Sequence, residues 1–439
     1  MKKRGHNDKK RILELVRQYY FREFSEKEFI PGKSKVHYAG RVFDEREMQA
    51  LVDSSLDFWL TLGTCGRKFE ESFSRYLDVK HTVVVNSGSS ANLAAVSALC
   101  SNRMPRCLKV GDEVLTTALN FPTTIAPLVQ NGLVPVFVDV DPGTYNIDVS
   151  RMEQALTDRT RAIFLAHTLG NPFNVKEVLR LKEKYGLFLI EDACDALDSR
   201  YNGRAVGTFG EAATFSFYAA HHITMGEGGA VTTNDPDIHK NLLSIRDWGR
   251  DCWCGTGESD PAGACQKRFN WSFPGLPQGY DHKYTYTNIG YNLKPLDLQC
   301  AIGLEQLKKL KRFTRKRNQN FKTLYSLFQE YGEYFLLPRT EKEAEPSWFA
   351  FPVTVRPNKR FSKNEFVRFL EDHLIETRPV FAGNILKHPA YQNIRHRVAQ
   401  DLVNTDQVLF HSFFMGVYPG LGNEQMDYIG RIVRKFFKG

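Results

Sequence analysis

Seven short apolar runs alternate with helix-like segments between residues 80 and 235, and this alternation limits most strongly how the chain can fold. The runs are TVVV (82–85), EVLTTAL (113–119), VPVFVDV (134–140), AIFLAH (162–167), LFLIED (187–192), ATFSF (213–217) and GAVTT (229–233). Continuous apolar strands are typical of a sheet that is covered on both faces. The sequence therefore predicts an α/β fold with a seven-stranded, mainly parallel sheet.

The rest of the chain predicts two further parts. Residues 248–292 are rich in Cys, Gly, Trp and Pro without a regular pattern, and long irregular insertions are usually functional. A helical run at 296–331 leads to a strand, FAFPVTV, and a helix, SKNEFVRFLEDH. We expect an amino-terminal helical segment (1–44) that packs on the small domain, a large α/β domain (45–311) that includes the irregular segment, and a small α+β domain (312–439).

The charge of the chain does not identify a partner. The 59 Lys and Arg residues exceed the 50 Asp and Glu residues, which favours acidic partners of any kind. Basic residues concentrate in LKKLKRFTRKR (307–317), but apolar residues interrupt them at helical spacing, which favours a solvated helix face over a nucleic-acid site. Because no apolar stretch approaches about 20 residues, we expect a cytoplasmic protein that binds neither membranes nor nucleic acid.

Polar residues follow several of the predicted strands. Asp192 ends LFLIED, at the kind of strand end where open parallel sheets bind ligands. A carboxylate there can keep a pyridine nitrogen protonated, or it can simply form a turn. NSGSSANL (86–93) stands between a strand and a helix, where it either binds a phosphate or caps the helix. Ser216, in TFSFYAAHHITMGEGG (214–229), offers a further hydroxyl to a phosphate.

These residues resemble the nucleotide-sugar aminotransferase and dehydratase family, which has the type I fold of pyridoxal phosphate (PLP)-dependent transferases. The resemblance includes GYNLKPLDLQ (290–299) and covers most of the chain. In the aminotransferases of the family, the fifth residue after the serine is the lysine that forms a Schiff base with PLP. Here that residue is His221. Because an imidazole forms no stable Schiff base, the resemblance implies free pyridoxamine phosphate (PMP) as cofactor and His221 as a catalytic base.

The same resemblance implies the remaining cofactor contacts. Asp192 would keep the pyridine nitrogen protonated, and Phe121 would either stack on the ring or belong to the core. Asn292 would reach the phosphate of a neighbouring protomer, so the active sites would require a homodimer. The phosphate would be bound by Gly88, Ser89, Ser90 and Ser216.

Four of the eight cysteines form a pattern of their own. Cys194 follows Asp192 by two residues, and the irregular segment supplies Cys252, Cys254 and Cys265. Four thiolates suit a tetrahedral zinc or an iron-sulfur cluster, and the spacing does not decide between them. A ligand so close to Asp192 brings the metal near the pyridine ring, which favours redox chemistry. With HHITMGEGG, RDWGRDC, GYDHKYTY and RPVFAGN, the pattern resembles that of the CDP-4-keto-6-deoxyglucose 3-dehydratases, which contain PMP and a 2Fe-2S cluster.

This second resemblance implies a reaction. The enzyme would remove the C3 hydroxyl of a CDP-4-keto-6-deoxyhexose in 3,6-dideoxysugar biosynthesis, with electrons from a flavin and iron-sulfur reductase. Candidates for contacts with the sugar nucleotide are Tyr218, Asp195, Arg378 and Asn384, with ion pairing, capping and packing as the alternative roles.

Three other interpretations remain open. The first is a dehydratase that needs no cluster, and the second is a sugar aminotransferase of the same family. The third, from another class of protein, is a zinc-stabilised regulatory or binding protein. The sequence leaves the nucleotide and the stereochemistry of the sugar undetermined.

Overall fold

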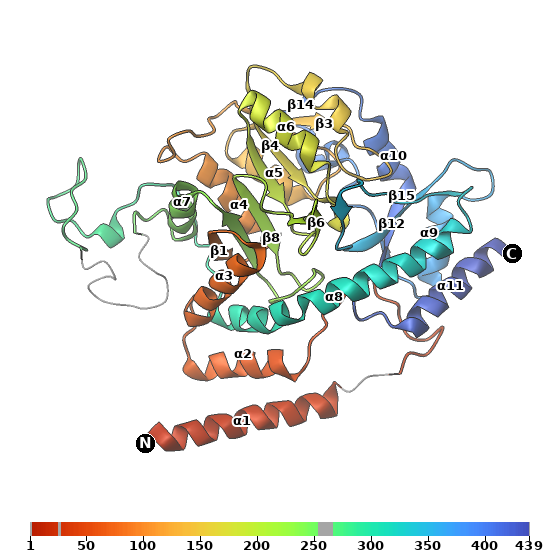
Figure 1. Cartoon of the computed structure of the whole chain (residues 1–439), viewed down its shortest axis with the longest axis horizontal. Helices are drawn as coiled ribbons and strands as arrows, with labels where there is room; N and C mark the ends of the chain where they lie inside the picture. Colours follow the sequence, from red (N-terminus) through yellow and green to blue (C-terminus); the bar gives the residue numbers. More distant parts are fainter. Residues whose placement is uncertain (1, 25–27, 253–266, 439) are drawn as a thin grey trace.

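Two sheets and one long helix determine the shape of the molecule. The computed structural model describes residues 2–24, 28–252 and 267–438 (Figure 1). An eight-stranded sheet forms the centre, and a four-stranded sheet, built from the carboxyl-terminal part of the chain, lies beside it. The helix α8 (Asp297–Gln329) runs past both sheets and connects them.

The large sheet has the strand order β1-β9-β8-β5-β4-β2-β3-β14. β9 pairs antiparallel with β1 and β8, and the other pairs are parallel. The strands are β1 (His81–Val85), β2 (Glu113–Thr117), β3 (Val134–Val138), β4 (Thr160–Ala166), β5 (Phe188–Asp192), β8 (Ala212–Ser216), β9 (Gly229–Thr233) and β14 (Arg397–Val398). The seven predicted strands and their mainly parallel arrangement are thus confirmed. β14 is an eighth edge strand, which the sequence analysis missed because two residues carry no periodic pattern.

Helices cover both faces of this sheet, as its continuous apolar strands require. Val83 and Val85 of β1 pack in one cluster with α4 (Gly88–Leu99) and α7 (Pro236–Arg246). Val84 between them packs in another cluster with α3 (Thr64–Leu77) and the first half of α8. The helix α6 (Val175–Tyr185) begins at the cap Asn174, ends at Gly186 and packs on strands β3, β4 and β5.

The carboxyl ends of several strands meet at one edge of the large sheet. β4, β5 and β8 are parallel to one another, and β1 has the same direction because both β1 and β8 are antiparallel to β9. The helix α4 begins three residues after β1, and α5 (Pro122–Gln130) begins five residues after β2. This topology places Gly88, Asp192 and Ser216 at the same edge.

The four-stranded sheet is antiparallel and has the order β10-β12-β15-β13. Its strands are β10 (Phe335–Leu336), β12 (Ala350–Val355), β13 (Thr377–Arg378) and β15 (Ser412–Gly416). A core rich in aromatic residues joins it to the second half of α8, α9 (Lys363–Asp372) and α11 (Asn423–Lys438). The predicted strand and helix of this part are therefore confirmed.

Smaller elements connect the two parts of the chain. A sheet of three short strands, β6 (Arg200–Tyr201), β7 (Arg204–Ala205) and β11 (Ala344–Glu345), brings residues from both parts together. The helix α10 (Val403–His411) leads directly into β15. The predicted domain boundary at 311/312 falls inside α8 and stays a prediction.

The amino-terminal segment contacts both parts of the molecule. The helix α1 (Lys2–Glu23) packs chiefly against α2 (Glu45–Asp57), which belongs to the expected large domain rather than the small one. Farther along, Phe29 and Val36 are buried in the core of the four-stranded sheet. Among the helices that the structure describes, none combines the length and the apolar character that a membrane span requires.

A buried carboxylate fastens α8 to α3. Asp297 Oδ1 accepts hydrogen bonds from the backbone N–H groups of Gly63 and Gly66, both at 2.8 Å, and Oδ2 accepts one from Cys65 at 3.1 Å. These donors lie in the first turn of α3, where backbone N–H groups have no partner within the helix. Asp297 therefore holds the two helices that support one face of the large sheet.

Replacement of Asp297 by alanine should lower the free energy of unfolding by about 3 kcal/mol or more, because buried N–H groups lose their acceptor. Chemical denaturation measures this loss. The matched control is Lys308→Ala, on the exposed face of the same helix, which should change stability by less than about 0.5 kcal/mol. Equal losses in the two variants would contradict the role given to Asp297.

Candidate active site

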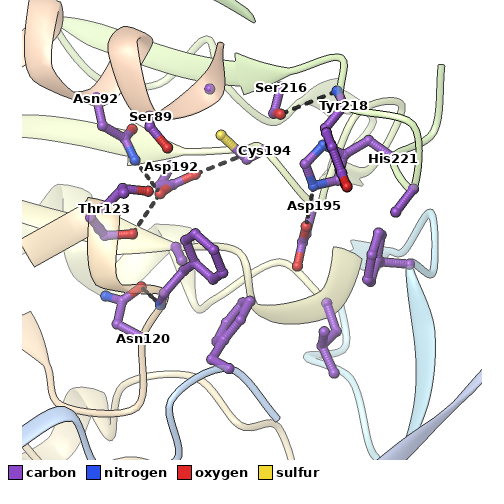
Figure 2. Close-up of a pocket in the computed structure, with 18 of the residues that line it drawn as sticks. Ser89, Asn92, Asn120, Thr123, Asp192, Cys194, Asp195, Ser216, Tyr218 and His221 are labelled. Carbon is purple, nitrogen blue, oxygen red and sulfur yellow. Dashed lines mark hydrogen bonds and ion pairs between the residues drawn. The ribbon is translucent and has the colours of Figure 1, made fainter. Parts of the chain in front are cut away.

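A cavity of about 460 Å³ opens at the edge where the strand ends meet (Figure 2). Its wall combines polar residues of the large sheet with aromatic residues near the small sheet, such as Phe349 and Phe414. The predicted residues that line it are Gly88, Ser89, Phe121, Asp192, Cys194, Asp195, Ser216, Tyr218, His221 and Arg378. The structure thus brings most of the predicted site together, while the chemical roles of these residues stay predictions.

Asp192 is held in a fixed orientation at the end of β5. Its Oδ2 accepts hydrogen bonds from Asn92 Nδ2 at 2.9 Å (Figure 2) and from Thr124 Oγ1 at 2.7 Å, while Oδ1 accepts one from the backbone N–H of Cys194. Asn92 Oδ1 in turn accepts a hydrogen bond from Thr214 Oγ1 of β8. The donors to Asp192 are backbone or neutral side-chain groups, so none of them is a cationic partner of the carboxylate.

The turn before α4 provides a site for an anion. Ser87 caps the helix, with its Oγ accepting from the backbone N–H of Ser90 at 3.0 Å. Gly88 and Ser89 line the cavity at the positive end of this twelve-residue helix, and Ser216 lies against Gly88. Ser90 is bonded to Ser87 instead and is not among the residues that line the cavity. The turn therefore suits a phosphate through Gly88, Ser89 and Ser216.

His221 and Asp195 lie side by side in the wall of the cavity (Figure 2). Its Nε2 lies 3.1 Å from Asp195 Oδ1, and both side chains are mostly buried. A turn after β8 positions the ring, since the backbone N–H of His221 donates to the carbonyl of Tyr218 at 3.0 Å. The ring also packs against Phe349, with 5.5 Å between ring centroids. This arrangement can hold a proton between an imidazole and a carboxylate.

The contact with His221 is one that was not foreseen for Asp195. Asp195 was expected to contact the sugar nucleotide, and its position in the cavity wall leaves that prediction standing. In the structure it bonds to His221 across 26 residues of sequence. A carboxylate beside an imidazole can stabilise the imidazolium and orient the ring, so the position of Asp195 also suits it to orient His221.

The described cysteines only partly test the predicted metal site. Cys194 lines the cavity, and burial together with the carboxylates of Asp192 and Asp195 raises the pKa of its thiol well above the usual value. Cys252 is half-buried. Cys254 and Cys265 lie outside the described residues. Within residues 2–24, 28–252 and 267–438, no three potential metal ligands gather.

The other predicted residues occupy different places. Arg378, in β13, lines the cavity and stacks on Tyr38 with 4.2 Å between its guanidinium and the ring centroid. Phe121 is half exposed in the cavity wall, which fits a ring-stacking residue better than a core residue. Asn384 is buried away from the cavity, where its amide donates to Asp406 at 2.7 Å. Asn292 is exposed and does not line the cavity of its own chain.

Sequence reasoning missed the residues that hold Asp192. Asn92 is a polar residue inside the apolar helix α4, which was a usable signal for a buried contact. Thr124 in FPTT carried no such signal, because threonine at a helix start usually caps the helix. The aromatic residues Tyr38, Phe349 and Phe414 reach the cavity from distant parts of the chain and could not be assigned from local pattern.

Comparisons with known proteins identify close relatives. The sequence profile of the DegT/DnrJ/EryC1/StrS aminotransferase family matches residues 42–434. The chain is 47% identical over 434 residues to the lipopolysaccharide biosynthesis protein RfbH of Salmonella typhimurium, with 99% of each chain covered. It is 46% identical over 429 residues to the dTDP-4-dehydro-2,6-dideoxy-D-glucose 3-dehydratase of Saccharopolyspora spinosa, covering 98% of this chain and 92% of that protein.

A solved structure has the same fold. The GDP-4-keto-6-deoxy-D-mannose-3-dehydratase of E. coli with bound hydrated PLP is 31% identical to this chain and superposes with a TM-score of 0.81. The match covers 91% of this chain and 100% of the other. The predicted type I fold of PLP-dependent transferases is therefore confirmed.

Replacement of Gly88 by alanine should weaken PMP binding by about tenfold or more, equal to roughly 1.4 kcal/mol. The added methyl group would lie 2.8 Å from Ser216 Oγ and 3.1 Å from Cys194 Sγ, which closes the anion site. Isothermal titration with PMP measures the change.

The matched control for Gly88→Ala is Gly332→Ala. The methyl group added there has an ordinary contact of 3.5 Å with the carbonyl of Gln329, so PMP binding should be unchanged. Wild-type affinity in Gly88→Ala would show that this turn does not hold the phosphate.

Proposed function

The chain belongs to the DegT/DnrJ/EryC1/StrS aminotransferase family, and we propose that it is a PMP-dependent dehydratase that removes the C3 hydroxyl of a nucleotide-linked 4-keto-6-deoxyhexose. The observation that carries the proposal is the identity of the cavity residues. No lysine is found among the described residues that line the cavity, and His221 stands five residues after Ser216. Sugar 3-dehydratases among the relatives support the same reaction class.

The cavity fits the amine form of vitamin B6. Asp192 offers an oriented carboxylate for a protonated pyridine nitrogen, and Gly88, Ser89 and Ser216 offer an anion site for the phosphate. Because a Schiff base to the protein requires a lysine, the cofactor would be held by these non-covalent contacts alone. When bound, PMP supplies a primary amine and a ring that accepts electrons.

The protein groups then divide the proton chemistry. Asp192 holds the proton on the ring nitrogen and so stabilises negative charge that develops in the ring. His221 Nε2 takes up and returns a proton, because an imidazole exchanges protons near neutral pH. Asp195 lies against the same nitrogen and stabilises the imidazolium that results. The substrate loses its C3 hydroxyl as water.

For the substrate, we propose a CDP-linked sugar. The choice of CDP rests on the subfamily resemblance of the cysteine and histidine motifs, and the relatives named above act on dTDP- and GDP-linked sugars. Arg378, Tyr218 and Asp195 line the cavity and are the best placed candidates for substrate contacts. A comparison of turnover with CDP-, dTDP- and GDP-4-keto-6-deoxyhexoses decides the nucleotide.

We further propose that Cys194, Cys252, Cys254 and Cys265 bind a 2Fe-2S cluster that receives electrons from a reductase. A thiol in the cavity wall, together with a segment that supplies three more cysteines, fits the thiolate donors of such clusters. Electrons delivered beside Asp192 would make the loss of the hydroxyl reductive and give a 3-deoxy sugar.

A second candidate is a dehydratase that needs neither cluster nor reductase. It is supported by the similarity to the sugar 3-dehydratase of E. coli, which was solved with bound hydrated PLP. The two candidates share His221 and Asp192 and differ in iron content. Both would be homodimers if Asn292, which is exposed in its own chain, reaches the cavity of a partner.

Replacement of His221 by asparagine should lower kcat for dehydration by about 100- to 10,000-fold, because the base is lost while most of the side-chain volume is kept. PMP affinity should stay at the wild-type value. The matched control, His388→Asn, changes an exposed histidine that is not among the residues that line the cavity and should leave both quantities unchanged. Dehydration by His221→Asn at the wild-type rate, or transamination by the wild type with glutamate as donor, would refute the proposal.

Anaerobically purified wild-type protein should contain iron and acid-labile sulfide in equal amounts. Cys194→Ser and Cys252→Ser should each lose both, because a cluster that lacks a thiolate ligand is not retained. Cys107→Ser, a half-buried cysteine outside the pattern, is the matched control and should keep them. Absence of iron from the wild type would favour the cluster-independent dehydratase.

A further inference from the structure

A second, much smaller cavity adjoins His221. It measures about 10 Å³, and its wall includes His221, His222 and Arg317. A bound water molecule needs roughly 10–15 Å³ and two to four polar partners, so this volume fits one water. Thr224 and Gln306 also line the cavity, and both side chains already bond to protein groups. The only wall residue with an exposed charge, within the described chain, is Arg41.

Three nitrogen atoms around this cavity have no hydrogen-bond partner among the described residues. They are His221 Nδ1, His222 Nδ1 and Arg317 Nε, and all three are buried. Buried polar atoms in folded proteins nearly always bond to protein or to ordered water. Three such atoms on residues that share one water-sized cavity point to a common partner.

The chemistry of two of these atoms is fixed by their neighbours. His222 Nε2 lies 2.8 Å from the carbonyl of Ser347, which only accepts, so Nε2 carries a hydrogen. Burial lowers the pKa of His222 well below its usual value, so the ring is neutral and its Nδ1 is an acceptor. Arg317 donates through Nη1 and Nη2 to the carbonyls of Phe349 and His221, both at 3.0 Å, and its Nε–H remains a donor.

We propose that this cavity binds one water molecule that sets the protonation state of the His221 ring. The water accepts a hydrogen bond from Arg317 Nε and donates one to His222 Nδ1. Its second lone pair then accepts from His221 Nδ1–H. An anion would meet the lone pair of His222, and a metal cation would meet the buried charge of Arg317, so water is the ligand that matches both.

This water matters because it supports the tautomer of His221 that can act as a base, a role that rests on the proposed function. With a proton on Nδ1, the Nε2 atom keeps a lone pair that can take up a second proton, and its 3.1 Å contact with Asp195 Oδ1 is the hydrogen bond of the ring protonated on both nitrogens. After Nε2 takes up a proton, it donates to Asp195 at 3.1 Å, and the water continues to accept from Nδ1. Without the water, a proton on Nδ1 would be buried and unpaired, and the ring would instead keep its proton on Nε2 beside Asp195. His222 and Arg317 are therefore positioning residues.

A high-resolution crystal structure of the wild-type protein tests the site directly. We expect an ordered water within hydrogen-bonding distance of His221 Nδ1, His222 Nδ1 and Arg317 Nε. Nitrogen-15 spectra of histidine-labelled protein should show His221 protonated on Nδ1, with the His221→Asn variant identifying its signals. A cavity filled by a protein group, or a neutral His221 protonated on Nε2, would overturn the proposal.

Two matched variants of His222 test the consequence. His222→Phe fills a similar volume but offers the water no acceptor. His222→Gln keeps an acceptor for the water and a donor for the carbonyl of Ser347. The phenylalanine variant should lose the water, and the proton of His221 should then be found on Nε2. Its kcat should fall about 10- to 100-fold with KM unchanged, which is the effect of removing a group that orients a functional histidine. The glutamine variant should keep most of the activity. Equal kcat in His222→Phe and the wild type would overturn the proposal.

The outcomes for the water and for the proposed function are separable. The crystal structure and the nitrogen-15 spectra need no substrate and no variant other than His221→Asn. A wild-type protein that holds the water yet dehydrates no nucleotide sugar would support the site and refute the proposed function alone.

Discussion

Hydrogen bonding to the Asp192 carboxylate is the interaction on which the rest of the site depends. Asn92 and Thr124 come from two helices that start at the same sheet edge, and both donate to one oxygen of a side chain at the end of β5. The parallel strands therefore do more than form a core. Their carboxyl ends fix one carboxylate at the base of the cavity, and the start of α4 offers an anion site beside it. A cofactor with a cationic ring and a phosphate is the ligand that such a pair of sites selects.

A second carboxylate changes what such a cofactor can do. Among the described residues that line the cavity there is no lysine, so none of them could bind the cofactor through a Schiff base. In the proposed function, His221 stands in for the Schiff-base lysine and, with Asp195 beside it, would contribute a proton carrier instead of an amine. Arg317 connects this group to the rest of the fold, since one guanidinium binds the carbonyl of His221 and that of Phe349 beside the small sheet. The proton carrier in place of an amine is why we propose elimination of a hydroxyl rather than transfer of an amino group.

Local pattern predicted the parts of the fold that depend on neighbouring residues in sequence. Apolar runs gave the seven strands, and strand ends gave Asp192 and Ser216, because a run of buried residues and its last polar residue are adjacent in the chain. Contacts between distant segments were missed for the opposite reason: the bond between Thr124 and Asp192 and the edge strand β14 have no local signature. Asn384 was expected in the site on the strength of a motif, but its side chain bonds to Asp406 of α10 and is not among the residues that line the cavity.

If His221 makes this protein a dehydratase, the C3 hydroxyl should be lost reversibly, which oxygen exchange measures. The protein with PMP and CDP-4-keto-6-deoxyglucose, but without a reductase, is incubated in water enriched in oxygen-18, and the recovered sugar is analysed by mass spectrometry. Reversible loss of the C3 hydroxyl predicts a second heavy oxygen in addition to the one that the C4 ketone exchanges by hydration. His221→Asn should give only the ketone exchange. The same single exchange with the wild type, or its conversion of the substrate to an amino sugar, would contradict the account.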